Sequence, residues 1–96
     1  MPRTRVVSQQ LTRSPQTVWR RGAFGIVLFP PRGDDPLTLA GTGAAVWDAL
    51  ATPASESELV DRLGRQFAAD TDRVRTDVKP LLEQLVDLGA VAVGDK

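Results

Sequence analysis

Few side chains in this sequence could perform covalent or metal chemistry. The 96 residues include no histidine, no cysteine and no tyrosine. Their absence excludes a histidine general base, a cysteine nucleophile and a thiolate zinc site. No serine lies in a nucleophile-like motif. We therefore expect a protein that is not an enzyme and that needs no cofactor.

Two acidic pairs are the remaining candidates for a metal or an acid–base site. Asp34 and Asp35 lie in a segment rich in proline and glycine, whereas Asp70 and Asp72 precede an apolar pattern typical of a helix. Turns and helix N-termini favour acidic residues for structural reasons alone. The sequence thus predicts no metal site and no catalytic residue.

The length and composition are those of one small globular domain. Hydrophobic residues make up 42% of the chain and charged residues 25%, which is a common balance for such domains. We expect a single domain over residues 1–96, with residues 1–15 as a loose N-terminal segment. No stretch has the length of a membrane span or of a signal peptide, which predicts a cytoplasmic protein without a membrane partner.

The charges are unevenly distributed along the chain. The net charge is zero, yet residues 1–33 contain six arginines and no acidic residue, so the remainder carries an excess of acid. An arginine-rich beginning is usually a solvated face or a loose tail. It could also steer an acidic ligand toward the domain.

The first half of the sequence has the pattern of β-strands. A short strand is predicted at residues 17–20, followed by a turn at Arg21-Gly22 and a central apolar strand at residues 24–29. The segment 30–36 has the prolines, glycine and aspartates that reverse a chain. Residues 37–39 can then return as a short edge strand. This order predicts a three-stranded antiparallel meander.

After residue 40 the apolar residues recur with a period near 3.6, which indicates helices. Thr42 is predicted to cap the first helix, which Thr52-Pro53 ends. Ser55 and Glu58 have the spacing of a capping box at the start of a second helix. This box is the clearest local signal in the chain.

A third helix is predicted between Asp70 as its cap and Gly89 in the left-handed position at its end. Pro80 removes a backbone donor inside this helix, so we expect a bend near Thr76 or a later start. Residues 90–93 can form a last strand or wing. The predicted fold is α+β, with a small three-stranded antiparallel sheet followed by a three-helix winged helix-turn-helix.

One stretch resembles a known family. Residues 39–50, LAGTGAAVWDAL, resemble the leucine, glycine, tryptophan and leucine signature of PqqD-like proteins. Glu58-Leu59-Val60 and the pattern from Asp77 to Gly89 extend the similarity, which covers roughly residues 17 to 93. Ala40, where the family often has asparagine, and Pro80 depart from the pattern.

The resemblance implies a recognition element for ribosomally made precursor peptides. Stand-alone proteins of this size are similar to the accessory proteins of lasso-peptide pathways, which present the precursor's leader segment to a leader peptidase and a cyclase. The implied partners are therefore the leader peptide and a leader peptidase or another modifying enzyme. In the family, the leader adds as an antiparallel strand beside the third strand and lies against the third helix.

Carried over to this chain, the resemblance implies a peptide-binding region on the third strand and the third helix. An edge strand offers unpaired amides and carbonyls, while apolar pockets select particular side chains. The implied residues are Leu37, Thr38, Leu39, Arg73, Val74, Asp77, Val78, Leu81 and Leu82. Leu37 and Leu39 face the same way in a strand, so Thr38 and the backbone face elsewhere. Trp47 is expected in the core, outside this region.

Two alternatives remain open. A winged-helix DNA-binding transcriptional regulator would have the same three-helix layout, but residues 70–89 hold five acidic residues against three basic ones. Because a recognition helix needs excess base to neutralise phosphates, we expect no nucleic acid partner. A scaffold that binds only other proteins would differ from the favoured function by failing to bind an isolated leader peptide.

Overall fold

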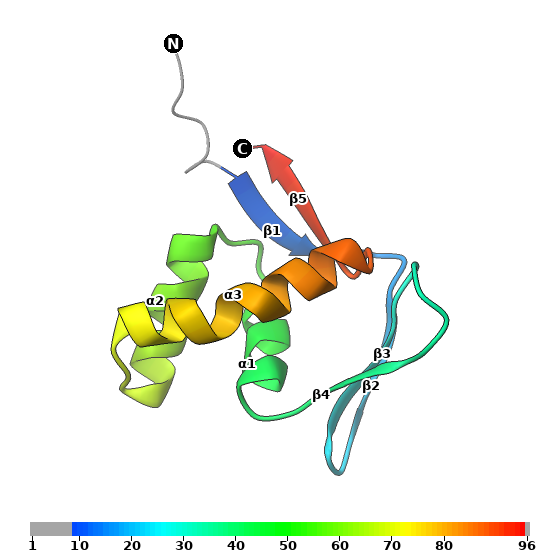
Figure 1. The fold of residues 1–96 in the computed structure, drawn as a ribbon, viewed down its shortest axis with the longest axis horizontal. Helices are drawn as coiled ribbons and strands as arrows, with labels where there is room; N and C mark the ends of the chain where they lie inside the picture. The colour runs from blue at the N-terminus through cyan, green and yellow to red at the C-terminus, as the bar shows by residue number, and fades with distance from the viewer. Residues whose placement is uncertain (1–8, 96) are drawn as a thin grey trace.

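The computed structural model describes residues 9–95, which form five strands and three helices (Figure 1). The predicted α+β fold is confirmed, with a three-stranded antiparallel sheet followed by three helices. The elements in chain order are β1 (Gln9–Arg13), β2 (Val18–Gly22), β3 (Gly25–Phe29), β4 (Leu37–Leu39), α1 (Thr42–Ala49), α2 (Glu56–Phe67), α3 (Thr71–Asp87) and β5 (Val91–Asp95).

The central sheet has the order β2-β3-β4, so β4 is an edge strand as predicted. Its register pairs Ile26 with Leu39 and Leu28 with Leu37. The first hairpin differs from the prediction, because β2 continues to Gly22 and the turn lies at Ala23 and Phe24 instead of Arg21 and Gly22.

The backbone at Gly25 explains where this hairpin turns. Its φ is 136°, a value that side-chain-bearing residues rarely adopt. A Cβ at this position would overlap the carbonyl oxygen of Leu39 on the neighbouring strand. Gly25 therefore allows the tight turn and the close approach of β4 to β3, and neither requirement is visible in a local strand pattern.

The expectation of a loose segment over residues 1–15 is wrong for residues 9–13, while residues 1–8 lie outside the described residues. Residues 9–13 form β1, which pairs antiparallel with β5. Leu11 is buried and also pairs with Ala54, with N···O distances of 2.7 and 3.2 Å. The segment QQLTR has only one large apolar residue, so it depends on partners far along the sequence to form a strand.

The capping predictions had mixed outcomes. The Glu58 carboxylate accepts a hydrogen bond from the Ser55 amide at 2.8 Å, and the Ser55 hydroxyl accepts one from the Glu58 amide at 3.1 Å. This confirms the capping box, and Asp70 caps α3 as predicted. Thr42 is not the cap of α1, because the helix begins at Thr42 and Gly41 occupies the capping position without a side-chain hydrogen bond.

Helix α3 is continuous across Pro80, and the expected later start is wrong because the helix begins at Thr71. Val78 and Leu82, on either side of the proline, are both buried in the core. Their packing holds the helix together where one backbone hydrogen bond is missing. Gly89 ends the helix region with a φ of 78°, as predicted.

The core is centred on Trp47 of α1, whose side chain is fully buried. Trp19 from β2 packs edge-on against it, with ring centroids 5.9 Å apart. The Arg13 guanidinium lies 4.9 Å from the centroids of both rings and donates two hydrogen bonds to the Trp47 carbonyl. Burial lowers the pKa of Arg13, and the nearby Asp48 carboxylate opposes that shift. This cluster joins β1, β2 and α1.

We predict that Gly25→Ala lowers the free energy of unfolding by about 2–4 kcal/mol, because it adds both backbone strain and a steric overlap. Gly22→Ala is the matched control in the same hairpin, since its Cβ would meet only the Gly25 carbonyl oxygen at 3.9 Å. Urea denaturation followed by circular dichroism measures both variants. Equal stability of the two variants would contradict the role given to Gly25.

A second prediction concerns acid stability. The hydrogen bond from the Ser55 amide holds the pKa of Glu58 below its ordinary value of 4.5. Folding therefore favours the ionised carboxylate, and its stabilising effect is present at neutral pH and is lost as the pH falls through the lowered pKa. Glu58→Gln removes this titration but keeps a capping side chain.

The difference in thermal midpoint between wild type and Glu58→Gln should be largest near pH 7 and should shrink toward pH 3. Ser55→Ala removes the other half of the box and should cost about 1 kcal/mol of stability at neutral pH. A difference between wild type and Glu58→Gln that stays constant with pH would contradict the assignment.

Candidate functional site

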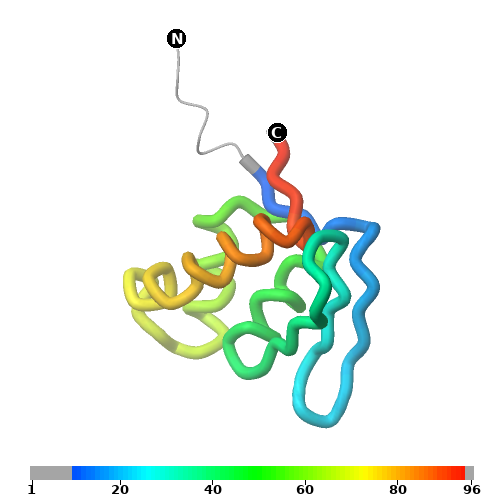
Figure 2. Tube along the Cα trace, turned by 45° about the vertical axis from the view of Figure 1, so that its right-hand side comes forward, coloured from blue at the N-terminus to red at the C-terminus, as the bar shows by residue number. Residues whose placement is uncertain are grey.

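The free edge of β4 is the first component of the candidate site. In Figure 2, β4 lies between β3 and α3. The Leu39 carbonyl points toward β3, where it would meet a Cβ at Gly25. Backbone polar groups of successive strand residues point to alternate sides, so the amide and carbonyl of Thr38 point to the free edge. These two groups can pair with an additional strand.

The side chains of β4 divide as the strand pattern predicts. Leu39 is only 4% exposed and Leu37 is half-buried, and both pack against the core. Thr38 is exposed on the opposite face. An incoming strand would therefore find a rigid receiving edge, because its two leucines are anchored.

Gly43 lies between this edge and α3. A Cβ at Gly43 would lie 3.5 Å from the Leu39 side chain and 3.6 Å from Leu81 Cδ2. Gly43 therefore lies between the β4 leucine and the α3 leucine, and its missing side chain leaves the surface between them open. Leu81 is half-buried and packs against the core from α3.

The six residues implied for the helical wall do not share one environment. Val74, Val78 and Leu82 are 7%, 1% and 6% exposed, so the core covers them. Arg73 and Asp77 are exposed and form an ion pair at 3.9 Å. Of the six, Arg73, Asp77 and Leu81 are the most accessible to a ligand. The three buried residues pack α3 against the core.

A cavity of about 320 Å³ extends this region at the start of α3. Phe67, at the end of α2, is 47% exposed at its wall. Thr42, three residues after the end of β4, also lines it. Neither residue belongs to the region implied by the family resemblance, since the sequence pattern predicted Thr42 only as a helix cap. The lining residues are Thr42, Leu63, Phe67, Ala69, Asp70, Arg73, Val74 and Asp77.

The loop between β3 and β4 fixes β4 relative to α3. The Arg32 amide donates to the Leu88 carbonyl at 2.9 Å, and the Arg32 guanidinium donates to the Asp87 carbonyl at 3.2 Å. Gly33 also lies against the Leu88 side chain. Because these carbonyls belong to the end of α3, the loop ties the edge strand to the helix.

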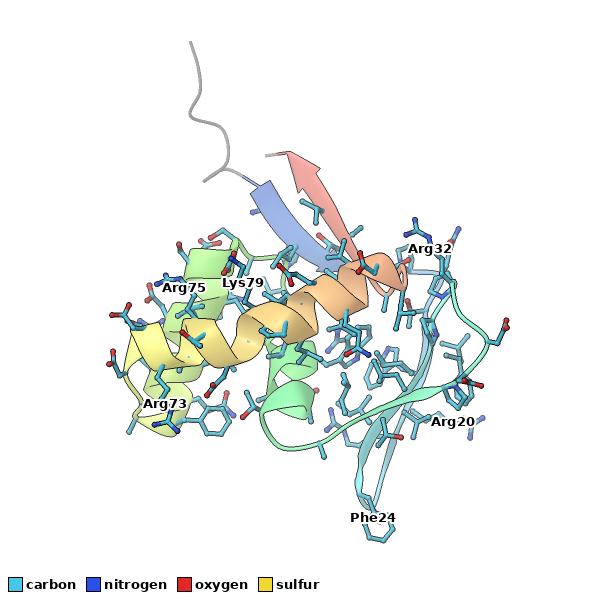
Figure 3. All side chains as sticks on the ribbon, in the orientation of Figure 1. Arg20, Phe24, Arg32, Arg73, Arg75 and Lys79 are labelled. Carbon is cyan, nitrogen blue, oxygen red and sulfur yellow. The ribbon has the colours of Figure 1, made fainter. Side chains whose placement is uncertain are left out.

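A larger cavity of about 490 Å³ lies on the other flank of α3, beside the β1–β5 ribbon. Leu82 contributes to its wall, together with Arg75 and Lys79, which Figure 3 shows on the flank of α3 away from Arg73. Leu82 is thus separated from the β4 edge by the body of the helix. Leu11, Val86 and Val93 form the rest of its apolar lining.

The candidate site offers groups that can bind a ligand by hydrogen bonds and apolar contacts. Within residues 9–95, no three carboxylates gather into a group that could hold a metal ion. None of the helices in that range combines the length and apolar character needed to cross a membrane. The chemistry available at the β4 edge is main-chain hydrogen bonding beside apolar side chains.

Comparison with known proteins identifies the family. Residues 25–91 match the family described as coenzyme PQQ synthesis protein D (PqqD), a span that runs from β3 to the first residue of β5. No curated protein and no solved structure matches the chain. Members of the family bind precursor peptides and act as chaperones without catalysing a reaction. Since the match covers more than half of the sequence and includes β4 and all three helices, this chain belongs to the PqqD family.

Proposed function

We propose that this protein is a single leader-recognition domain, which binds the leader of a ribosomally made precursor peptide by strand addition at β4. It then presents the leader to modifying enzymes, such as the leader peptidase and cyclase of a lasso-peptide pathway. The observation that carries the proposal is the free edge of β4, where the Thr38 amide and carbonyl point away from β3.

Main-chain pairing gives the affinity in this mechanism. The Thr38 amide donates to a guest carbonyl and the Thr38 carbonyl accepts from a guest amide, in an antiparallel pair. Because β4 has only three residues, few such bonds form. The resulting interface is small and reversible, as suits a carrier that must release the leader.

Side chains give the selectivity. Alternate guest side chains point toward α3, where they meet Leu81 and the open surface above Gly43. An antiparallel guest places its N-terminal residues beyond Leu39, toward the cavity lined by Thr42 and Phe67. This geometry favours a leader with apolar residues at alternate positions and a further apolar residue upstream of them.

Charged side chains border the apolar cavity. The Arg73–Asp77 ion pair is exposed, with side chains 79% and 60% accessible, so it contributes little to stability. Either partner can therefore exchange its interaction for an oppositely charged leader residue at low cost. We expect a moderate dependence of leader binding on salt concentration.

The decisive experiment is a titration of the protein with a fluorescently labelled leader peptide from the neighbouring precursor gene, followed by anisotropy. Saturable binding of the leader, without binding of a scrambled leader or of a DNA duplex, is the expected result. Duplex binding without leader binding would replace the proposal with a DNA-binding regulator. Failure to bind either would favour a scaffold for other proteins.

We predict that Thr38→Pro weakens leader binding by about tenfold or more, because proline removes the amide that pairs with the guest. Thr38→Val is the matched control, since it keeps the amide and the branched side chain on an exposed position. Anisotropy titrations compare the two variants after circular dichroism has verified their fold. Equal affinity of both variants would refute the proposed pairing.

We also predict that Leu81→Ala weakens leader binding about fivefold to tenfold, from the loss of roughly 1 kcal/mol of apolar contact. Val86→Ala truncates a half-buried residue on the opposite flank of α3 and should leave leader affinity unchanged. If Val86→Ala weakened leader binding and Leu81→Ala did not, the leader would bind in the cavity beside the β1–β5 ribbon instead.

A further inference from the structure

Exposed apolar side chains concentrate on one hairpin of this protein. Among the described residues, the large hydrophobic side chains that remain exposed are Val18, Phe24, Phe29, Phe67 and Val93. The first three belong to the hairpin formed by β2 and β3. Phe24 is 90% exposed, which is unusual for a phenylalanine.

The strand register places the apolar residues of this hairpin on one face. Val18 pairs with Phe29, and Arg20 pairs with Val27, which in turn pairs with Thr38. Directly paired residues share a face of the sheet, and the alternate positions, such as Leu28, face the core. We call this set the outer sheet face, made up of Val18, Arg20, Val27, Phe29 and Thr38.

Phe24 extends this surface at the tip of the hairpin. The pairing of Gly22 with Gly25 leaves Ala23 and Phe24 as a two-residue turn. Figure 3 shows Phe24 at the tip, pointing away from the helices, and Arg20 on the side of the sheet remote from α3. Both side chains are exposed.

The charge of the outer sheet face selects among possible occupants. Ion pairs in residues 9–95 form at Arg13, Arg21, Arg73 and Arg75, and none forms at Arg20. The face itself carries no acidic residue. Two copies packed through this face would bring two arginines into an apolar contact without a carboxylate, which costs free energy. The complementary surface is therefore apolar, acidic and on another protein.

We propose that the outer sheet face, together with Phe24, docks the modifying enzyme that acts on the bound leader. The enzyme would supply an apolar patch for Val18, Phe24 and Phe29 and a carboxylate for Arg20. This inference rests on the proposed function, because a guest strand beside β4 would extend the same sheet. Alternate guest side chains would then continue the outer sheet face next to Thr38, and the enzyme would contact carrier and leader together.

The test uses the whole chain, the labelled leader, and the modifying enzyme encoded beside the precursor gene. Phe24→Ser and Arg20→Glu alter two exposed side chains that do not contribute to the core. Val18→Ser removes a third exposed side chain. Val93→Ser is its matched control, because this valine is also exposed but belongs to β5, in the other sheet. Leader affinity is measured by anisotropy and enzyme affinity by calorimetry, in separate titrations.

We expect Phe24→Ser, Arg20→Glu and Val18→Ser each to weaken enzyme binding about tenfold, as for central interface residues. Leader affinity should stay within about twofold of wild type, since β4 is unchanged. Val93→Ser should change neither affinity.

Enzyme binding that is unaffected in all three variants would overturn this inference while leaving leader binding intact. A wild-type dimer that Phe24→Ser dissociates in sedimentation would assign the face to a second copy instead. Absence of leader binding by the wild type would refute the proposed function itself. The proposal that the enzyme contacts the carrier and the leader together would then also be refuted.

Discussion

The burial of Trp47 is the interaction on which the rest of this structure depends. Its indole is fully buried and contacts Trp19 of the sheet edge-on, while Arg13 of β1 lies over both rings and binds the Trp47 carbonyl. A large aromatic side chain gains most of its stabilisation from area removed from water. One residue of the shortest helix thus joins α1 to the central sheet and to the N-terminal strand.

With the core fixed in this way, two glycines determine what the surface offers. Gly25 lets β4 approach β3 closely, and Gly43 keeps the space between Leu39 and Leu81 open. The β3–β4 loop then anchors the edge strand to the end of α3 through Arg32. The unpaired edge is therefore rigid and next to an apolar helix flank, which is the combination that strand addition requires. The match to the PqqD family supports the proposal that this edge receives a precursor peptide.

In the two proposals, the same small sheet serves two partners, because a strand has an edge and two faces. The inner face, with Ile26 and Leu28 completely buried, provides the core. The edge at Thr38 is available for a guest backbone, and the outer sheet face carries apolar side chains and Arg20. If both proposals hold, the protein brings a peptide and an enzyme onto one continuous surface.

The sequence by itself determined the features that rest on local patterns. The capping box at Ser55, the left-handed Gly89, the three-stranded meander and its edge strand all follow from turn residues, caps and periodicity. The family resemblance carried by the segment around Trp47 also required no coordinates. Only the tertiary structure decided the strand at residues 9–13 and the placement of Arg13 on two tryptophans, since both depend on partners distant in sequence. The residues implied on α3 likewise divided into buried and exposed ones according to which flank of α3 packs against α1 and α2, because helical periodicity identifies a face but not its neighbour.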